Sequence, residues 1–227
     1  RANSAVSRLN ATGALTEPPF ELLACLSLAS RVHGASGGRF DPTIQPLWAR
    51  YANAAIKGTT PDRETRDKAL SLVGWHKVGI NAGAVTLRPG MSLTLNGIAQ
   101  GYIADRVADL LRGEGLTDIL IDTGEFRALG QHPHGGPWPV RLASGGRVPL
   151  VSRAVATSAV HGTTFDDGAQ IGHILDPQSG LPARGFCKEL SISARSAAVA
   201  DALSSAGCLC GNAHELDVLL SKFDGAK

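Results

Sequence analysis

The 227-residue chain is 43% hydrophobic and 19% charged, a composition typical of globular proteins. Its formal net charge of +2 is too small to indicate nucleic acid or an acidic membrane surface as a partner. Aromatic residues, at 5%, are too few for base-stacking platforms, and no apolar stretch is long enough for a membrane span. Because the chain begins at Arg1 and shows no signal peptide, we expect a processed or trimmed chain.

The N-terminal region predicts a loop, a helix and a second loop. Residues 1–15 have the composition of an entry loop. Residues 16–32 predict a helix, because Thr16 can cap it and two prolines occupy its first turn. A glycine-rich loop follows over residues 34–43.

The next region predicts a second helix and a β-hairpin. The helix has Thr60 as its N-cap and Pro61 as its first residue, a position where proline is well tolerated. Short apolar runs on either side of residues 81–83 indicate two strands joined by a turn.

The central region, residues 92–124, predicts a strand, a glycine loop, a helix and a further strand. On the helix, apolar residues recur at the spacing of one helical face. These residues are Ile103, Val107, Leu110 and Leu111.

The C-terminal part predicts a short strand at 140–142, a strand at 189–195 and a final helix that Ser196 can cap. Strands and helices do not alternate in the regular order of a parallel βαβ fold. We therefore expect an α+β architecture of mixed sheets with packed helices.

Asp201 and Ser205 lie four residues apart on the final helix and therefore share a face. The residues around them are small, which would let a ligand or another backbone come close. A carboxylate and a hydroxyl oxygen are ligands that suit a hard cation such as Mg²⁺. The alternative is a solvated or capping Asp, with a Ser that bonds to its own helix backbone.

Gly97 and Gly101 lie around a predicted strand-to-helix junction, where backbone N–H groups can bind a phosphate. The alternative is an ordinary glycine turn. The pattern is neither GxGxxG nor a Walker A motif, so the dinucleotide folds that use those motifs are not supported.

The octet at residues 173–180, HILDPQSG, admits two interpretations. Asp176, the proline after it and Gly180 are residues that make a turn. The same groups could instead face a ligand at the end of a strand, and His173 could then supply a proton donor or a phosphate partner near the carboxylate of Asp176.

Taken in order, seven short motifs resemble the ApbE family of FAD:protein FMN transferases, and the resemblance extends over nearly the whole chain. Each motif is weak by itself, but the ordered series is specific. The motifs are SRLN (7–10), GRFDPT (38–43), NGIAQGYIAD (96–105), DTG (122–124), ATS (156–158), HILDPQSG (173–180) and ADALSS (200–205).

The resemblance implies an ApbE-like, T-fold-like architecture and a site that binds FAD as the substrate, with Mg²⁺. Mg²⁺ would be held by Asp201, Ser205 and the backbone carbonyl of Ala99, and His173 and Asp201 would be the catalytic residues. The implied FAD-binding residues are Asn96, Gly97, Gln100, Gly101, Asp122, Thr157, His173, Ile174, Asp176 and Ser179.

The implied activity is Mg²⁺-dependent transfer of FMN from FAD to a threonine hydroxyl of a carrier protein, with release of AMP. Two alternatives stay open: an FAD-binding protein without transfer activity, and an FAD pyrophosphatase that yields FMN and AMP. The first of them draws on two departures from the family pattern, Gln100 in place of a common Lys and Glu125 in place of a Gly.

The remaining expectations concern the setting of the protein. We expect one ApbE-like domain over residues 1–227 that lacks the N- and C-terminal extremes of the family. The partners are a carrier protein and FAD, with no nucleic acid, and membrane contact only through an anchor absent from this chain. The resemblance implies a periplasmic location.

Overall fold

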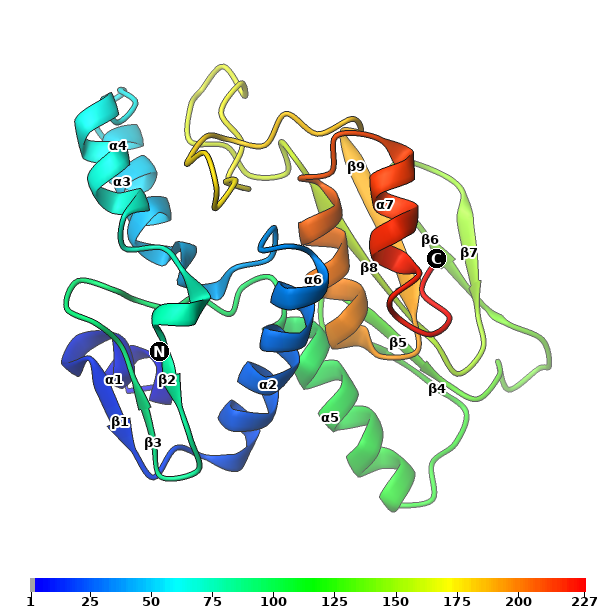
Figure 1. Ribbon diagram of the computed structural model, residues 1–227. Coiled ribbons are helices and arrows are strands. Elements are labelled where there is room, and N and C mark those ends of the chain that lie inside the picture. The colour runs from blue at the N-terminus through cyan, green and yellow to red at the C-terminus, as the bar shows by residue number, and fades with distance from the viewer. Residues whose placement is uncertain (1–2) are drawn as a thin grey trace. The chain divides into compact units, whose positions relative to one another are not determined.

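The computed structural model describes residues 3–227, which form two compact units (Figure 1). The first unit runs to Leu95 and resumes over Val160–Arg184, and the second comprises Asn96–Ala159 and Gly185–Lys227. Helices combined with antiparallel sheets confirm the α+β prediction. No helix within residues 3–227 has the length and apolar character needed to cross a membrane. The expectation of one domain stays a prediction.

The first unit begins with a helix where we expected a loop. Helix α1 (Ala5–Thr12) is capped by the Ser4 side chain. The amide of Asn10 donates to the Leu93 carbonyl at 2.8 Å and accepts the Leu93 N–H at 2.7 Å. Leu93 is thereby held by a side chain 83 residues away, and residues 92–95 form no strand, contrary to the prediction.

The predicted helix at residues 16–32 begins later, as α2 (Phe20–Ala35). Thr16 does not cap it, because its backbone belongs to strand β1 (Ala14–Thr16), which pairs antiparallel with β3 (Ala84–Thr86). Strand β2 (Gly79–Ile80) also pairs antiparallel with β3, which confirms the predicted hairpin. Long-range strand pairing thus overrode the local capping signal.

The other helices of the first unit surround an apolar cluster. Asp62, not Thr60, caps the second predicted helix, by accepting the Thr65 N–H at 2.7 Å. The cluster includes Leu47 and Leu175, which come from the two separate sequence segments of the unit. The helices are η1 (Pro42–Ile44), α3 (Gln45–Ala55), α4 (Arg63–Leu70) and η2 (Trp75–Lys77).

The second unit is built on an antiparallel sheet of strand order β4-β5-β8-β9, beside which β6 and β7 form a separate hairpin (Figure 1). The final helix is confirmed, and Ser196 caps it by accepting the Val199 N–H at 3.2 Å. The elements are α5 (Ala99–Gly113), β4 (Ile119–Asp122), β5 (Phe126–Leu129), β6 (Trp138–Arg141), β7 (Arg147–Leu150), β8 (Ala154–Ala159), β9 (Glu189–Ala194), α6 (Ala197–Gly207) and α7 (Ala213–Leu220).

Helix α5 buries a different face from the one that its apolar residues predicted. Ile103 and Leu110 are 53% and 64% exposed. Helices α5 and α6 approach so closely that a Cβ on Gly101 would collide with the backbone of Ala197. Only small side chains fit there, and the buried residues of α5 are Gly101, Ala104 and Ala108.

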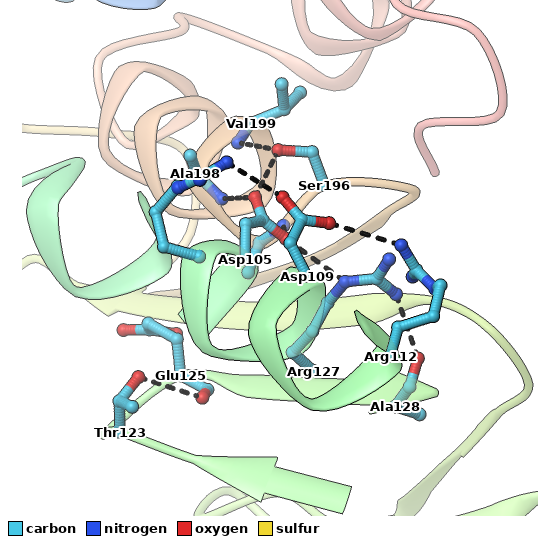
Figure 2. Close-up of polar contacts among 12 residues, drawn as sticks. Asp105, Asp109, Arg112, Thr123, Glu125, Arg127, Ala128, Ser196, Ala198 and Val199 are labelled. Carbon is cyan, nitrogen blue, oxygen red and sulfur yellow. Dashed lines mark hydrogen bonds and ion pairs between the residues drawn. The ribbon is translucent and has the colours of Figure 1, made fainter. Parts of the chain in front are cut away.

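Asp105 joins α5 to the first turn of α6 and to β5 (Figure 2). Its carboxylate accepts hydrogen bonds from the Ser196 hydroxyl at 2.6 Å and from the Ala197 and Ala198 N–H groups at 2.9 and 3.0 Å. The Arg127 guanidinium, from β5, approaches the same carboxylate at 3.1 Å. A negative charge at a helix N-terminus is favourable, because the free N–H groups there carry partial positive charge.

We expect Asp105→Asn to lower the free energy of unfolding by about 2–4 kcal/mol, because it removes the charge and leaves donors facing an amide group. Urea denaturation measures the change. Asp109→Asn is the matched control on the same helix. Asp109 pairs with Arg106 and Arg112 at the surface, so its loss is expected to cost no more than about 0.5 kcal/mol. Equal effects of the two substitutions would contradict this role of Asp105.

Candidate functional site

The predicted site residues fall into two groups, one in each unit. The second unit holds the residues of the α5 junction together with Asp122, Thr157, Asp201 and Ser205. The first unit holds the predicted site residues of the 173–180 octet. Each group is built by its own elements.

Asp201 lies in the middle of α6 and is only 5% exposed. Its carboxylate accepts the N–H of Gly101, near the start of α5, at 3.2 Å. Burial raises the pKa of Asp201 to about 7, since no basic side chain within residues 3–227 offsets the loss of water around the carboxylate. The solvated-Asp alternative is therefore wrong.

The turn between β4 and β5 is tied to the start of α5. The Gln100 side-chain amide donates to the Thr123 carbonyl, and the Thr123 hydroxyl donates to the Gln100 carbonyl, both at 3.2 Å. Asp122 closes the turn by accepting the Gly124 N–H at 2.9 Å. Gln100 thus has a structural role in this chain, because its side chain and carbonyl tie α5 to the turn.

Glu125 follows that turn and was not predicted as a site residue. Its carboxylate accepts the Thr157 N–H, from β8, at 3.3 Å. Burial, followed by the negative charges of Asp201 and Asp122, raises the pKa of Glu125 to about 8. Glu125 is thus repelled by two other carboxylates in this part of the unit. The repulsion between Glu125 and Asp201 is visible only in the fold, because the two residues are far apart in sequence.

Hydroxyl groups line the adjoining part of α6 and β8. The Ser158 hydroxyl lies 2.7 Å from that of Ser204 and 3.2 Å from that of Ser205. Ser204, rather than Ser205, bonds back to the helix, by donating to the Asp201 carbonyl at 2.9 Å. Asp201 and Ser205 both lie on α6 four residues apart and therefore share a helix face, but a role of the Ser205 hydroxyl beside Asp201 stays a prediction.

The donor atoms predicted for Mg²⁺ are oxygens, the type of ligand that a hard divalent cation prefers. Ala99 is the first residue of α5, two positions before the Gly101 that bonds to Asp201. Within residues 3–227 no group of three or more His, Cys, Asp or Glu side chains is arranged as a metal site. The predicted Mg²⁺ ligands are of another kind, namely one carboxylate, one hydroxyl and one backbone carbonyl. A bound cation would also offset the repulsion between the carboxylates of Asp201 and Glu125.

The other predicted residues of the second unit lie close to these groups in the fold. Asn96 and Gly97 form the turn that leads into α5. The Gly101 N–H, which we expected to be available to a phosphate, is engaged by Asp201. Thr157 is exposed, and its hydroxyl lies 2.8 Å from that of Ser191 on β9.

In the first unit, His173 is oriented by a single carbonyl group. The backbone N–H of His173 and its Nδ1 both lie at hydrogen-bond distance from the Thr163 carbonyl, at 3.0 and 2.9 Å. A carbonyl oxygen can only accept, so Nδ1 carries the hydrogen. The neutral ring is therefore left with Nε2 as a proton acceptor.

Residues 176–180 form a turn that its own side chains close. The Asp176 carboxylate accepts the Gln178 N–H at 2.9 Å and the Ser179 hydroxyl at 2.6 Å. Gly180 has a φ of +70°, which favours glycine. Ile174 precedes the turn, and its carbonyl accepts the N–H of Ala183 at 2.8 Å. The turn interpretation of the octet is confirmed, and its ligand role stays a prediction.

Two contacts that the sequence did not reveal anchor this turn. The Tyr51 hydroxyl, on α3, donates to the Gly180 carbonyl at 2.9 Å from a buried position. The Gln178 side chain donates to the Gly37 carbonyl, in the glycine-rich loop, at 3.0 Å. The partners are separated by 129 and 141 residues, so no local pattern could identify them.

Comparison with known proteins places these features in a family. The sequence profile of the ApbE family matches residues 1–226. The FAD:protein FMN transferase of Treponema pallidum is 28% identical over 99% of this chain, and one from Klebsiella pneumoniae is 32% identical over 80%. The apo crystal structure of the flavinyl transferase ApbE from Pseudomonas stutzeri superimposes on 98% of the chain with a TM-score of 0.84 and 28% identity.

The chain is shorter than these relatives. It covers 70% of the Treponema protein, 60% of the Klebsiella protein and 73% of the Pseudomonas structure. The match nevertheless includes both groups of predicted site residues, since it runs from residue 1 to residue 226.

The raised pKa of Asp201 predicts how stability changes with pH when no metal is present. An unfolded Asp ionises near its ordinary pKa of 3.8, whereas the folded residue keeps its proton up to about 7. The folded state therefore binds more protons between these values, and the free energy of unfolding falls as the pH rises. With chelator present, we expect Asp201 by itself to contribute a loss of about 2–3 kcal/mol between pH 5 and pH 8, to which Glu125 adds in the same direction.

Asp201→Asn should remove the part of the pH dependence that Asp201 contributes, because the amide does not titrate, whereas the part from Glu125, whose pKa burial raises to about 8, should remain. Chemical denaturation at a series of pH values measures it for both proteins. A flat wild-type profile, or an unchanged slope in the variant, would show that Asp201 is not the buried titrating group.

Proposed function

This chain belongs to the ApbE family, and we propose that it transfers FMN from FAD to a threonine hydroxyl of a carrier protein. The observation that carries the proposal is the match of residues 1–226 to the ApbE family, together with the similarity of this chain to relatives named FAD:protein FMN transferase. In this reaction the threonine oxygen bonds to the phosphorus of the FMN part. The bond to the AMP phosphate breaks, and AMP leaves with the electron pair.

We assign the binding of Mg²⁺ to Asp201, Ser205 and the carbonyl of Ala99. A buried carboxylate without a basic partner supports this assignment, since a bound cation would supply the missing positive charge. Mg²⁺ supplies neutralisation of phosphate charge, the main electrostatic requirement of phosphoryl transfer. The chain's own contribution is to hold these oxygens on two helices that pack tightly together.

We propose that Nε2 of His173 takes the proton from the acceptor hydroxyl. The bond between Nδ1 and the Thr163 carbonyl supports this assignment, because it orients the ring and leaves Nε2 as the acceptor. The proposed FAD-binding residues of each unit are those named from the sequence, except that the Gly101 N–H is engaged by Asp201. The identity of the carrier and a periplasmic location remain part of the proposal.

Incubation of the chain with FAD, Mg²⁺ and a threonine-containing carrier domain tests the function. Covalent flavin on the carrier, detected as in-gel fluorescence, supports transfer. Free FMN with AMP would identify a pyrophosphatase, and unchanged bound FAD would identify a binding protein. Either of these results would overturn the proposed function.

We expect Asp201→Ala to abolish Mg²⁺-dependent transfer and to weaken Mg²⁺ binding, with the fold retained. Calorimetry with Mg²⁺ reports binding directly, and circular dichroism reports the fold. Asp217→Ala is the matched control, because Asp217 is an exposed residue of α7, a helix that carries none of the predicted site residues. Wild-type Mg²⁺ affinity in the Asp201 variant would remove the metal assignment.

We expect His173→Asn to lower the transfer rate by at least about tenfold and to change FAD affinity much less, since Asn can form hydrogen bonds but cannot take the proton. Single-turnover kinetics and FAD titration separate the two effects. His214→Asn, in an exposed part of α7, is the control. If rate and affinity fall together, His173 is a binding residue, and the assignment of the proton fails.

A further inference from the structure

The β6–β7 hairpin presents two unlike faces. Val140 and Leu150 are buried and pack against Ala128 and Val155 of the main sheet. Side chains alternate along a strand, so the residues between them point outward. These exposed residues are Pro139, Arg141, Arg147 and Pro149.

Arg141 and Arg147 are register partners directly across the hairpin. Like charges placed opposite each other destabilise a strand pair. The other arginines of this segment are neutralised or bonded: Arg127 pairs with Asp105 at 3.1 Å, and Arg153 donates to the Ser193 hydroxyl at 3.1 Å. No acidic partner of Arg141 or Arg147 exists within residues 3–227.

The surrounding sequence offers no acid to neutralise this pair. From Phe126 to Phe165 the chain contains no Asp or Glu, although the whole sequence has 20 of them. The outward face of the hairpin therefore lies in a long segment without acidic residues, and no neighbour in sequence neutralises its positive charge. An anionic group from another molecule is the kind of partner that would remove the repulsion.

We propose that the outward face of the β6–β7 hairpin binds an acidic segment of the protein that accepts FMN. The proposal rests on the proposed function for the existence of a protein acceptor. Two guanidinium groups side by side donate paired hydrogen bonds to carboxylates, which gives both charge and geometric complementarity. An acidic protein is favoured over a lipid surface, because the net charge is only +2 and the face holds just these two cations.

The two prolines exclude a different mode of binding. Pro139 and Pro149 are register partners and have no N–H group. A peptide that added to the hairpin as a further strand would find donors missing from both strands. Recognition on this face therefore depends on side chains, and the arginines supply its charge.

The hairpin lies on the opposite face of the main sheet from the residues assigned to metal binding. Arg127 points toward α5, where it meets Asp105, so its neighbour Ala128 points to the other face, against the hairpin. Docking there leaves the Asp201 region untouched. Loss of docking at the hairpin should raise the KM for the acceptor protein and leave the affinity for FAD unchanged.

Arg141→Glu is the informative variant, because it places Glu opposite Arg147 and replaces repulsion with attraction. We expect an unchanged or higher Tm. Affinity for a synthetic peptide of Asp and Glu around one Thr should fall at least about tenfold, and binding should weaken with added salt. The amide analogue, with Asn and Gln, is expected not to bind. Calorimetry with the full chain measures each affinity.

Arg106→Glu is the matched control, since it makes the same charge change on α5, and it should leave peptide affinity within about twofold of the wild-type value. The double variant Arg141→Gln, Arg147→Gln is the second test, and its affinity for the acidic peptide should fall as it does in Arg141→Glu. Equal losses in the control and in Arg141→Glu would overturn the proposal. Binding of the amide peptide as tightly as the acidic one would also overturn it.

Phosphatidylglycerol vesicles and inorganic phosphate are the remaining probes. If either binds through Arg141 and Arg147 while the acidic peptide does not, the proposal is wrong and the face serves another anion. Peptide binding requires no catalysis, so the two proposals fail separately. If FMN transfer is absent but peptide binding depends on the two arginines, only the proposed function is refuted. If transfer is normal but peptide binding does not depend on the arginines, only the docking surface is refuted.

Discussion

The second unit depends on one carboxylate, that of Asp105. It holds the first turn of α6 against α5 and reaches Arg127 on β5, so two helices and the sheet meet at a single side chain (Figure 2). Helix α6 carries Asp201 and α5 carries Gly101, and the bond between these two residues requires the close approach that Asp105 maintains. Small residues on the facing surfaces permit that approach, because a Cβ at Gly101 would collide with the backbone of α6.

This close approach accounts for the electrostatics of the proposed metal site. It buries Asp201 without a basic partner, and the turn before β5 adds Glu125 nearby, with its pKa also raised by burial and by negative neighbours. A protein that only needed stability would avoid such an arrangement, because buried carboxylates without partners are costly. The cost is understandable if the unit is built to receive a cation together with a phosphorylated ligand.

The first unit positions its groups by other means, through hydrogen bonds that surround a turn. The Thr163 carbonyl orients His173, the side chain of Asp176 closes the turn, and the Tyr51 hydroxyl fixes the carbonyl of Gly180 from a buried position on α3. A ligand-binding loop held at several points loses little conformational entropy on binding. The octet that admitted two interpretations is a well-formed turn, and its rigidity is compatible with the proposed role in binding.

The sequence by itself determined the α+β class, the family, the 79–86 hairpin and the final helix with its Ser196 cap, because local chemistry or ordered motifs carry that information. It also predicted that Asp201 and Ser205 share a face, which follows from helical spacing alone. Only the tertiary structure decided the start of α2, the helix at α1 and the buried face of α5. Strand pairing set the start of α2, and the contact with α6 set the buried face of α5, neither of which is local in sequence. Helix α1 has its own Ser4 cap, but its Asn10 side chain binds the backbone of Leu93, 83 residues away.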